Sequence, residues 1–137
     1  MAKAARKSGV EIRSLDHVVL TVADVAATEA FYARVMGMRA VTFEGGRHAL
    51  GFGSQKINLH QAGREFEPKA KRPTPGSADL CFLVETPLDD VIAHVEREGV
   101  AIIEGPVERT GATGPLRSIY FRDPDGNLIE LSNPIRR

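Results

Sequence analysis

Two histidines and two carboxylates, His17, His60, Asp79 and Glu130, are the candidate metal ligands of this chain. Each lies in a segment where side chains alternate in character, so each is expected on one face of a β-strand. Imidazole nitrogens and carboxylate oxygens together suit Zn, Ni, Mn, Fe or Co better than a metal that seeks thiolates. Any one of them alone is more typical of a structural side chain. Their recurrence at equivalent places of an internal repeat predicts one divalent metal ion of unspecified identity.

The elements that must position these residues occur twice along the chain. A strand followed by a helix is predicted over residues 15–22 with 25–36, and again over 77–84 with 87 to about 98. Asp24 suits the N-cap of the first helix, and Gly37 and Gly99 follow the last turns of the two helices. Superposing the two copies places His17 on Asp79. The repeat therefore places candidate metal ligands at equivalent positions of the two halves.

Three short strands are predicted after each helix, separated by turns rich in Gly, Pro and Asp. They cover roughly residues 38–43, 47–52 and 56–60 in the first half, and 101–104, 116–122 and 127–132 in the second. The fold class is therefore predicted as α+β, with two βαβββ modules forming a cupped, mostly antiparallel sheet. The expected divisions are a disordered basic tail over 1–12 and one domain over 13–135, made of module 1 (15–60), a linker (61–76) and module 2 (77–133).

Composition excludes several classes of protein. The 137 residues suit one domain, and a hydrophobic share of 42% suffices for a core. The single cysteine, Cys81, cannot form an internal disulfide, so a reducing, cytoplasmic location is expected, with Cys81 as a small core residue. Eighteen basic and eighteen acidic residues give no electrostatic reason to bind nucleic acid. No apolar run approaches the ~20 residues that cross a membrane.

Alternation along the strands assigns the candidate residues to one face, the face of the cup. In the first strand His17 is expected there, while the neighbouring apolar residues point to the helix. Asn58 and His60 share that face on the fourth strand. Asp79 lies opposite Leu80 on the fifth strand. The last strand carries Glu130 and Ser132 on one face, but both of its faces also carry apolar residues, so alternation there does not decide which face meets the core.

Three stretches, residues 15–22, 31–38 and 121–131, closely resemble the vicinal oxygen chelate superfamily. This superfamily includes glyoxalase I, extradiol dioxygenases, fosfomycin resistance enzymes and bleomycin resistance proteins. The most specific part is the run that begins at Asp123-Pro124-Asp125-Gly126-Asn127. Residues 56–61 and 65–70 resemble, more narrowly, the glyoxalase domain-containing protein 5 group.

The resemblance implies a homodimer in which metal sites are often shared between the first module of one subunit and the second of its partner. His17 matches the first-strand His ligand, and Glu130 matches the last-strand Glu ligand. Glyoxalase I places Glu on the fourth strand, where this chain aligns Asn58 or His60. Other members place His on the fifth strand, where this chain has Asp79, which either binds the metal, hydrogen-bonds a metal-bound water, or does neither.

Candidate substrate-binding residues come from the same resemblance and from charge. Tyr120 stands ten residues before Glu130, as a ligand-contacting Tyr does in fosfomycin enzymes, and Ser118 resembles a Ser there. If the hairpin pairs Tyr120 with Glu130, both point into the cup. Arg47 and Lys69 are candidate anchors for an anionic substrate.

The predicted function is a divalent-metal-dependent enzyme acting on a small oxygenated substrate, with the metal as a Lewis acid. Asp79 or Glu130 would move the proton as the catalytic carboxylate. Glyoxalase-like isomerase or lyase chemistry fits better than oxidation. The alternatives are a dioxygenase of the same superfamily and a non-catalytic antibiotic-binding resistance protein. No nucleic-acid or membrane partner is expected.

Overall fold

The computed structural model describes residues 9–136. Residues 1–8 of the predicted basic tail therefore lie outside the described residues. The first module consists of β1 (His17–Val22), α1 (Val25–Met36), β2 (Arg39–Phe43), a short 3-10 turn (Glu44–Gly46), β3 (Arg47–Phe52) and β4 (Gln55–Gln61). The second consists of β5 (Asp79–Leu83), α2 (Leu88–Arg97), β6 (Glu104–Thr110), β7 (Pro115–Arg122) and β8 (Leu128–Pro134).

Each module forms its own four-stranded sheet, and the two sheets have the same topology. The strand orders are β1-β4-β3-β2 and β5-β8-β7-β6. In each sheet one pair of strands is parallel, β1 with β4 and β5 with β8, and the other two pairs are antiparallel. The predicted α+β fold of two βαβββ modules is therefore confirmed.

The helix boundaries follow from local hydrogen bonding. The Asp24 carboxylate accepts a hydrogen bond from the backbone N–H of Ala27 at 3.0 Å, and Gly37 ends α1 with φ 67°. Both features were expected, since a capping oxygen satisfies a free N–H and glycine accommodates positive φ. Pro87 precedes α2 without a capping side chain. Instead, Asn133 of β8 accepts a hydrogen bond from the Leu88 N–H at 2.7 Å.

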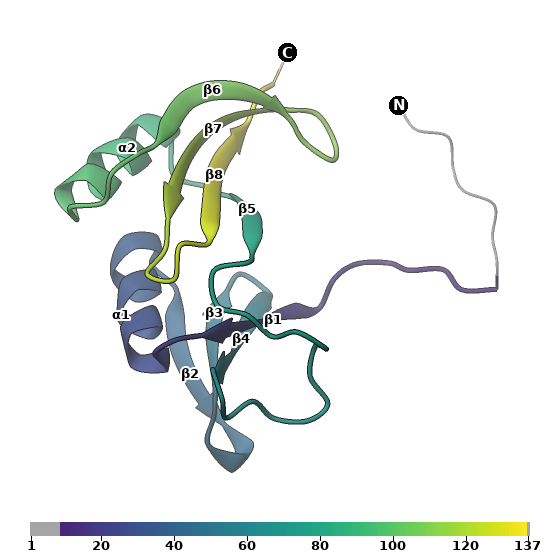
Figure 1. Ribbon diagram of the computed structural model, residues 1–137. Helices are drawn as coiled ribbons and strands as arrows, with labels where there is room; N and C mark the ends of the chain where they lie inside the picture. Colours follow the sequence, from purple (N-terminus) through teal and green to yellow (C-terminus); the bar gives the residue numbers. More distant parts are fainter. Residues whose placement is uncertain (1–8, 137) are drawn as a thin grey trace.

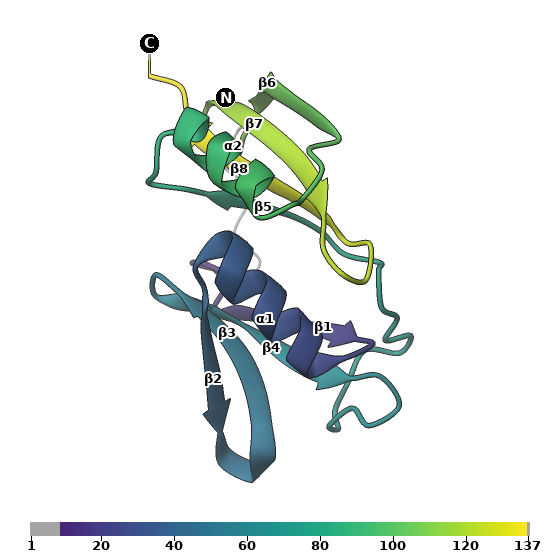
Figure 2. The same cartoon turned by 90° about the vertical axis from the view of Figure 1, so that its left-hand side faces the viewer.

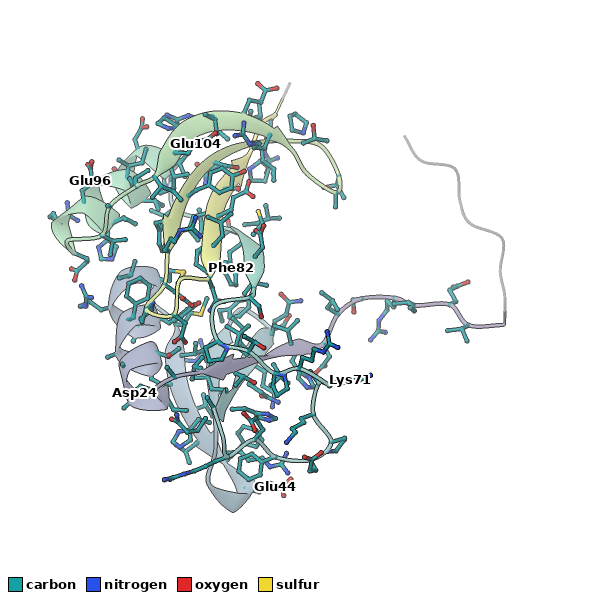
Figure 3. The ribbon with its side chains drawn as sticks, in the orientation of Figure 1. Asp24, Glu44, Lys71, Phe82, Glu96 and Glu104 are labelled. Carbon is teal, nitrogen blue, oxygen red and sulfur yellow. The ribbon has the colours of Figure 1, made fainter. Side chains whose placement is uncertain are left out.

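One face of each sheet is covered by its helix, and this layer holds the hydrophobic core. From α1 the buried residues include Phe31, Tyr32 and Val35, which meet Ile57 and Leu59 of β4 in the same cluster. The core continues between the modules, because the Phe52 and Phe82 rings meet edge to face at 5.4 Å. Figure 3 shows Phe82 where β5 approaches the first module. We call the opposite, uncovered face of each sheet its open face.

A buried hydrogen bond joins the two modules. The Tyr32 hydroxyl of α1 donates to Asp123 in the turn between β7 and β8, at 2.5 Å. Arg34 of α1 also pairs with Glu98 beyond α2, at 3.0 Å. Both helices lie on the same side of the molecule (Figures 1 and 2). The two open faces therefore look toward the other side together, and within one chain they do not close on each other.

One strand differs from its predicted position. The strand expected over 101–104 is β6, Glu104–Thr110, and the apolar residues before it form a loop. Its composition is polar, it contains Pro106, and its pairing with β7 shifts between Glu104 and Val107. Proline and bulges are typical of an edge strand, which alternation of apolar residues does not reveal. In the described range, no helix has the length and apolar character needed to cross a membrane.

Replacing Tyr32 by Phe is expected to lower the free energy of unfolding by about 1.5–3 kcal/mol, because Asp123 loses a buried charge-assisted hydrogen bond. Urea denaturation measures this loss. Arg34→Gln, which removes a partly exposed ion pair, is the control and should cost less than about 1 kcal/mol. Equal unfolding free energies for wild type and Tyr32→Phe would contradict the assignment.

The same bond predicts a pH dependence. Burial, and then the hydrogen bond to Asp123, raise the pKa of Tyr32 above its ordinary value of 10.0. Tyr32 therefore contributes its full stability below pH 10, and this contribution falls above that pH because the unfolded side chain then ionises. The difference in stability between wild type and Tyr32→Phe should shrink as urea denaturation is repeated at increasingly alkaline pH.

Candidate functional site

The open face of the second module carries a connected set of polar side chains. Its strands present Asp79 and Cys81 from β5, Ser118 and Tyr120 from β7, and Glu130 and Ser132 from β8. Tyr120 lies directly opposite Glu130 in the β7–β8 pair, as expected. The apolar Ile129 and Leu131 point to the helix side and are buried. This burial places Glu130 on the open face, which alternation in the last strand had left undecided.

Hydrogen bonds link the residues around Glu130. The Ser132 hydroxyl lies 3.3 Å from a Glu130 carboxylate oxygen and 2.6 Å from the Ser118 hydroxyl. The Cys81 sulfur lies 3.4 Å from the same Ser132 oxygen. Cys81 is exposed on the open face, so its prediction as a core residue was wrong. Partial desolvation of the sulfur against Ser132, with Glu130 nearby, raises the pKa of the thiol, which therefore stays protonated at neutral pH.

Tyr120 is held by a residue that sequence reasoning missed. The Arg109 guanidinium of β6 donates a hydrogen bond to the Tyr120 oxygen at 3.1 Å and also pairs with Glu104. Burial raises the pKa of Tyr120, Arg109 lowers it, and Glu130 raises it. Because Arg109 occupies an acceptor position of the phenol oxygen, the Tyr120 proton is free to point toward Glu130 or a bound molecule. Arg109 was missed because the predicted strand, 101–104, ends before Arg109, whereas β6 extends to Thr110.

His17 lies on the open face of the first module, together with a partner that was not predicted. Its Nδ1 is 2.9 Å from the carboxylate of Asp16, and the hydrogen bond to His17 lowers the pKa of Asp16. A carboxylate on Nδ1 favours the tautomer that leaves Nε2 as an acceptor, the form in which a histidine binds metal. Adjacency of Asp16 and His17 in the sequence was the available signal.

The strand register corrects one expectation about the repeat. His17 pairs with Lys56, two residues before Asn58, and Asp79 pairs with Leu128, two residues before Glu130. Asn58 is thus the counterpart of Glu130, and its buried Oδ1 has no hydrogen-bond partner among the described residues. His60 corresponds to Ser132 instead, and its ring packs against Phe66 at 5.8 Å. A two-residue shift keeps the same face, so alternation alone could not separate Asn58 from His60.

The two predicted anionic-substrate anchors both have partners. The Arg47 guanidinium lies over the Phe66 ring at 4.4 Å. The Lys69 ammonium is 3.0 Å from Glu67 and 3.7 Å from Glu65. Arg47 lies on the open face of β3, two residues before Ala49, which pairs with Asn58. Lys69 lies beside Val19 and Thr21 of the same face. The linker that carries Lys69 folds back over the lower part of the first module (Figure 1).

The candidate ligands do not converge within one chain. His17 and His60 lie on the open face of the first sheet, whereas Asp79 and Glu130 lie on that of the second. Among residues 9–136, no group of three or more His, Cys, Asp or Glu side chains is close enough to hold a metal ion. His17 of β1 and Glu130 of β8 instead lie on the open faces of two sheets. Because both helices lie on one side of the molecule, these faces look to the same other side (Figures 1 and 2).

Comparison with known proteins matches the whole fold. Residues 14–131 match the family described as the Glyoxalase/Bleomycin resistance protein/Dioxygenase superfamily. The chain is 63% identical over 121 residues to virulence protein STM3117 of Salmonella typhimurium, covering 88% of this chain and 84% of that protein. The crystal structure of STM3117 has a TM-score of 0.91 at 60% identity and covers 92% of this chain and 100% of that one. Glyoxalase domain-containing protein RDO1 of Mycosarcoma maydis is 57% identical over 124 residues, covering 90% of this chain and 70% of that protein.

More distant structures share the fold alone. Lactoylglutathione lyase from Agrobacterium tumefaciens has a TM-score of 0.67 at 23% identity, covering 88% of this chain and 92% of its own. The fosfomycin resistance protein FosX from Listeria monocytogenes, complexed with Mn(II) and sulfate, has a TM-score of 0.64 at 21% identity, covering 91% and 93%. The names of the two curated relatives state no reaction, so chemistry must be argued from the open faces.

The Arg109–Tyr120–Glu130 arrangement predicts two pKa shifts of opposite sign. The chain has two tyrosines, and Tyr32 is protected from ionisation by burial, so alkaline ultraviolet titration reports Tyr120. Arg109→Gln should raise the pKa of Tyr120 because it removes a nearby positive charge, and Glu130→Gln should lower it because it removes a negative one. Glu85→Gln, at an exposed site beyond β5, is the control and should leave it unchanged. Shifts of the same sign in both site variants would contradict the arrangement.

Proposed function

Because the chain belongs to the glyoxalase/bleomycin resistance protein/dioxygenase superfamily, we propose that it is a divalent-metal-dependent enzyme acting on a small oxygenated substrate. The observation that carries the proposal is the placement of His17 and Glu130 on two open faces that look to the same side of the chain. Isomerase or lyase chemistry is the reaction class that we favour. The narrower likeness to the glyoxalase domain-containing protein 5 group belongs to the same proposal.

The donor set has the chemistry that a divalent ion requires. His17 is oriented by Asp16, so its second ring nitrogen is available. Asp79 is exposed, and Glu130 accepts a long hydrogen bond from Ser132. The buried Asn58 Oδ1 lacks a partner among the described residues, and such an atom is costly unless a ligand or water meets it. One imidazole with carboxylate and amide oxygens suits Zn, Ni, Mn, Fe or Co.

A second copy of the chain would supply the missing half of the site. Each open face carries one pair of candidate ligands, His17 with Asn58 and Asp79 with Glu130, at equivalent registers. Bringing the first module of one copy against the second module of another unites the two pairs, twice, around a two-fold axis. We therefore propose a homodimer whose two sites are shared between subunits.

Charge and exposure support this pairing. The open face of the first module carries Lys56 over the Phe43 ring and Arg47 over the Phe66 ring. That of the second carries the carboxylates of Asp79 and Glu130 together with Arg109. Basic side chains on the first face can thus meet carboxylates on the second, which favours pairing of unlike modules over pairing of like modules. Apolar side chains on both faces are also exposed, with Val19 at 45% and Leu83 at 63%. A second copy would bury them.

When bound, a divalent ion supplies Lewis acidity that polarises neighbouring substrate oxygens and favours loss of an adjacent proton. The residues of the chain then divide the remaining work. Asp79 or Glu130, whichever is less firmly coordinated, accepts and returns the proton. Tyr120 donates its hydroxyl proton to the substrate oxygen on which negative charge develops, and Arg109 holds it in that orientation. Ser118 and Ser132 keep the Glu130 carboxylate in place.

Metal content tests the proposal directly. The purified protein is stripped, refilled in parallel with Mn, Fe, Co, Ni and Zn, and analysed for bound metal. One metal ion per chain is expected for the wild type, with loss in His17→Gln and Glu130→Gln because each removes a ligand. Glu85→Gln is the control and should retain the metal. Failure of the wild type to take up any of these metals would contradict the proposal and favour a sequestering protein.

Mixing two defective variants tests whether the sites are shared. His17→Gln and Glu130→Gln each lack binding alone, but a mixed dimer has one site with both native residues. Random exchange of subunits should therefore restore about a quarter of the wild-type metal capacity in a two-fold dimer. Sites formed within one chain would show no recovery on mixing.

A further inference from the structure

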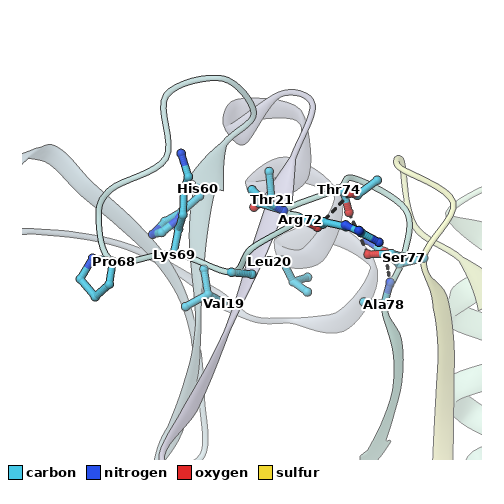
Figure 4. A pocket seen from close by; sticks show the side chains of 13 residues that line it. Val19, Leu20, Thr21, His60, Pro68, Lys69, Arg72, Thr74, Ser77 and Ala78 are labelled. Atoms are coloured by element: carbon cyan, nitrogen blue, oxygen red, sulfur yellow. Dashed lines mark hydrogen bonds between the residues drawn. The ribbon is translucent and has the colours of Figure 1, made fainter.

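A small cavity lies beneath the linker, beside the open face of the first module. It has a volume of about 360 Å³ and is formed by β1, the end of β4 and residues 68–78. Figure 4 shows His60 and Lys69 at one end and Arg72, Thr74 and Ser77 at the other, with Val19 and Thr21 between them. Cavities of this size suit small organic molecules.

The linker is fixed at both ends, so the cavity is a formed feature of the chain. Near its start, the Phe66 ring packs against His60 and lies under Arg47. Near its end, the Ala78 N–H donates to Asn127 at 2.8 Å. Gly76 packs so closely on the β7–β8 turn that a Cβ there would lie 2.5 Å from the carbonyl oxygen of Asp125. The roof of the cavity therefore depends on the turn that also binds Tyr32.

The two charged residues that line the cavity differ in whether their charge is already paired. Only Lys69 and Arg72 bear formal charge among the described residues that line it, and no carboxylate does. Lys69 is paired with Glu67 and Glu65, which neutralise it. The Arg72 guanidinium makes no hydrogen bond or ion pair with the residues that the structure describes. Arg72 is therefore the cation available to a ligand.

The uncharged residues that line the cavity indicate which groups a ligand would carry besides its anionic group. Thr74 and Ser77 donate their hydroxyl protons to linker carbonyls, so they close the turn that holds Arg72 and present acceptor oxygens to the cavity. Apolar surface comes from Val19, Leu20, Pro68, Ala70, Pro73 and Ala78. A planar guanidinium binds a carboxylate through two parallel hydrogen bonds, and apolar walls accept a carbon skeleton.

We infer that this cavity binds a small organic acid, with its carboxylate on Arg72 and its carbon skeleton against the prolines and β1. Binding of the acid stands on the cavity alone. The further statement that this acid is the substrate rests on the proposed function, because Thr21 and His60 connect the cavity to the open face that carries His17.

Benzoate and its neutral counterpart benzamide are suitable probes, since they differ in charge and little in shape. Titration of the isotope-labelled, metal-free full-length protein, followed by amide NMR shifts, should place benzoate at residues 19–21 and 68–78, with weaker binding of benzamide. Arg72→Gln should weaken benzoate binding about tenfold, because one charge-assisted hydrogen-bond pair is lost. The control, Arg64→Gln, changes an exposed arginine of the same linker that does not line the cavity and should bind as wild type.

Each outcome separates this inference from the proposed function. If benzoate binding depends on Arg72 but the protein takes up no metal, the acid-binding site is supported. The same result contradicts the proposal that the protein is a metal-dependent enzyme. Equal affinity for benzoate and benzamide, or equal benzoate affinity in wild type and Arg72→Gln, overturns the acid site whatever the metal content. Shifts centred outside the linker and β1 overturn it as well.

Discussion

The arrangement of the molecule depends on one buried carboxylate. Asp123 accepts hydrogen bonds from the backbone N–H groups of Asp125 and Asn127, each at 2.9 Å, which close the turn between β7 and β8. Its other oxygen accepts from the Asn127 amide and from the Tyr32 hydroxyl of α1. Removing any one of these donors leaves a buried carboxylate oxygen less well satisfied and lowers stability. One residue therefore closes a turn of the second module and attaches it to the helix of the first.

This constraint reaches both proposed sites. Asn127, held by Asp123, accepts the Ala78 N–H and so fixes the end of the linker over the first module. Tyr32 fixes α1 against the second module, which places both helices on one side and both open faces on the other. The Asp123–Asn127 segment, the most specific part of the family resemblance, acts here as a joint between modules. It contributes no side chain to the open faces that carry the candidate ligands.

Sequence reasoning succeeded where short-range physical rules decide the structure. Asp24 and Gly37 mark the ends of α1 because capping and positive φ are local requirements. Alternation placed His17 and Asp79 on the open faces because a half-buried strand must direct its apolar side chains to one side. It left Glu130 undecided, because both faces of the last strand carry apolar residues. The internal repeat also predicted that the second half repeats the order of strands and helix along the first.

Sequence reasoning failed where the position of a residue depends on the pairing between strands. Alternation could not distinguish Asn58 from His60 as the counterpart of Glu130, because only the register of β4 with β1 separates them. It missed Arg109 because the polar edge strand β6 has no apolar pattern, and the residue enters the site through pairing with β7. The relation between the two modules was equally inaccessible, since it depends on the contact of Tyr32 with Asp123, 91 residues apart.

The two open faces have become unlike despite a shared fold, and the difference suggests a division of labour. The linker roofs part of the first face and forms a cavity whose available charge is a single guanidinium. The second face has no such cover and carries the hydrogen-bonded Tyr120, Glu130 and Ser132. In the proposed dimer, the guanidinium proposed to bind an acid would lie beside the carboxylates proposed to move protons. A dimer built from two identical modules of either kind would have two acid-binding cavities or two polar faces with Glu130, but never one of each at the same site.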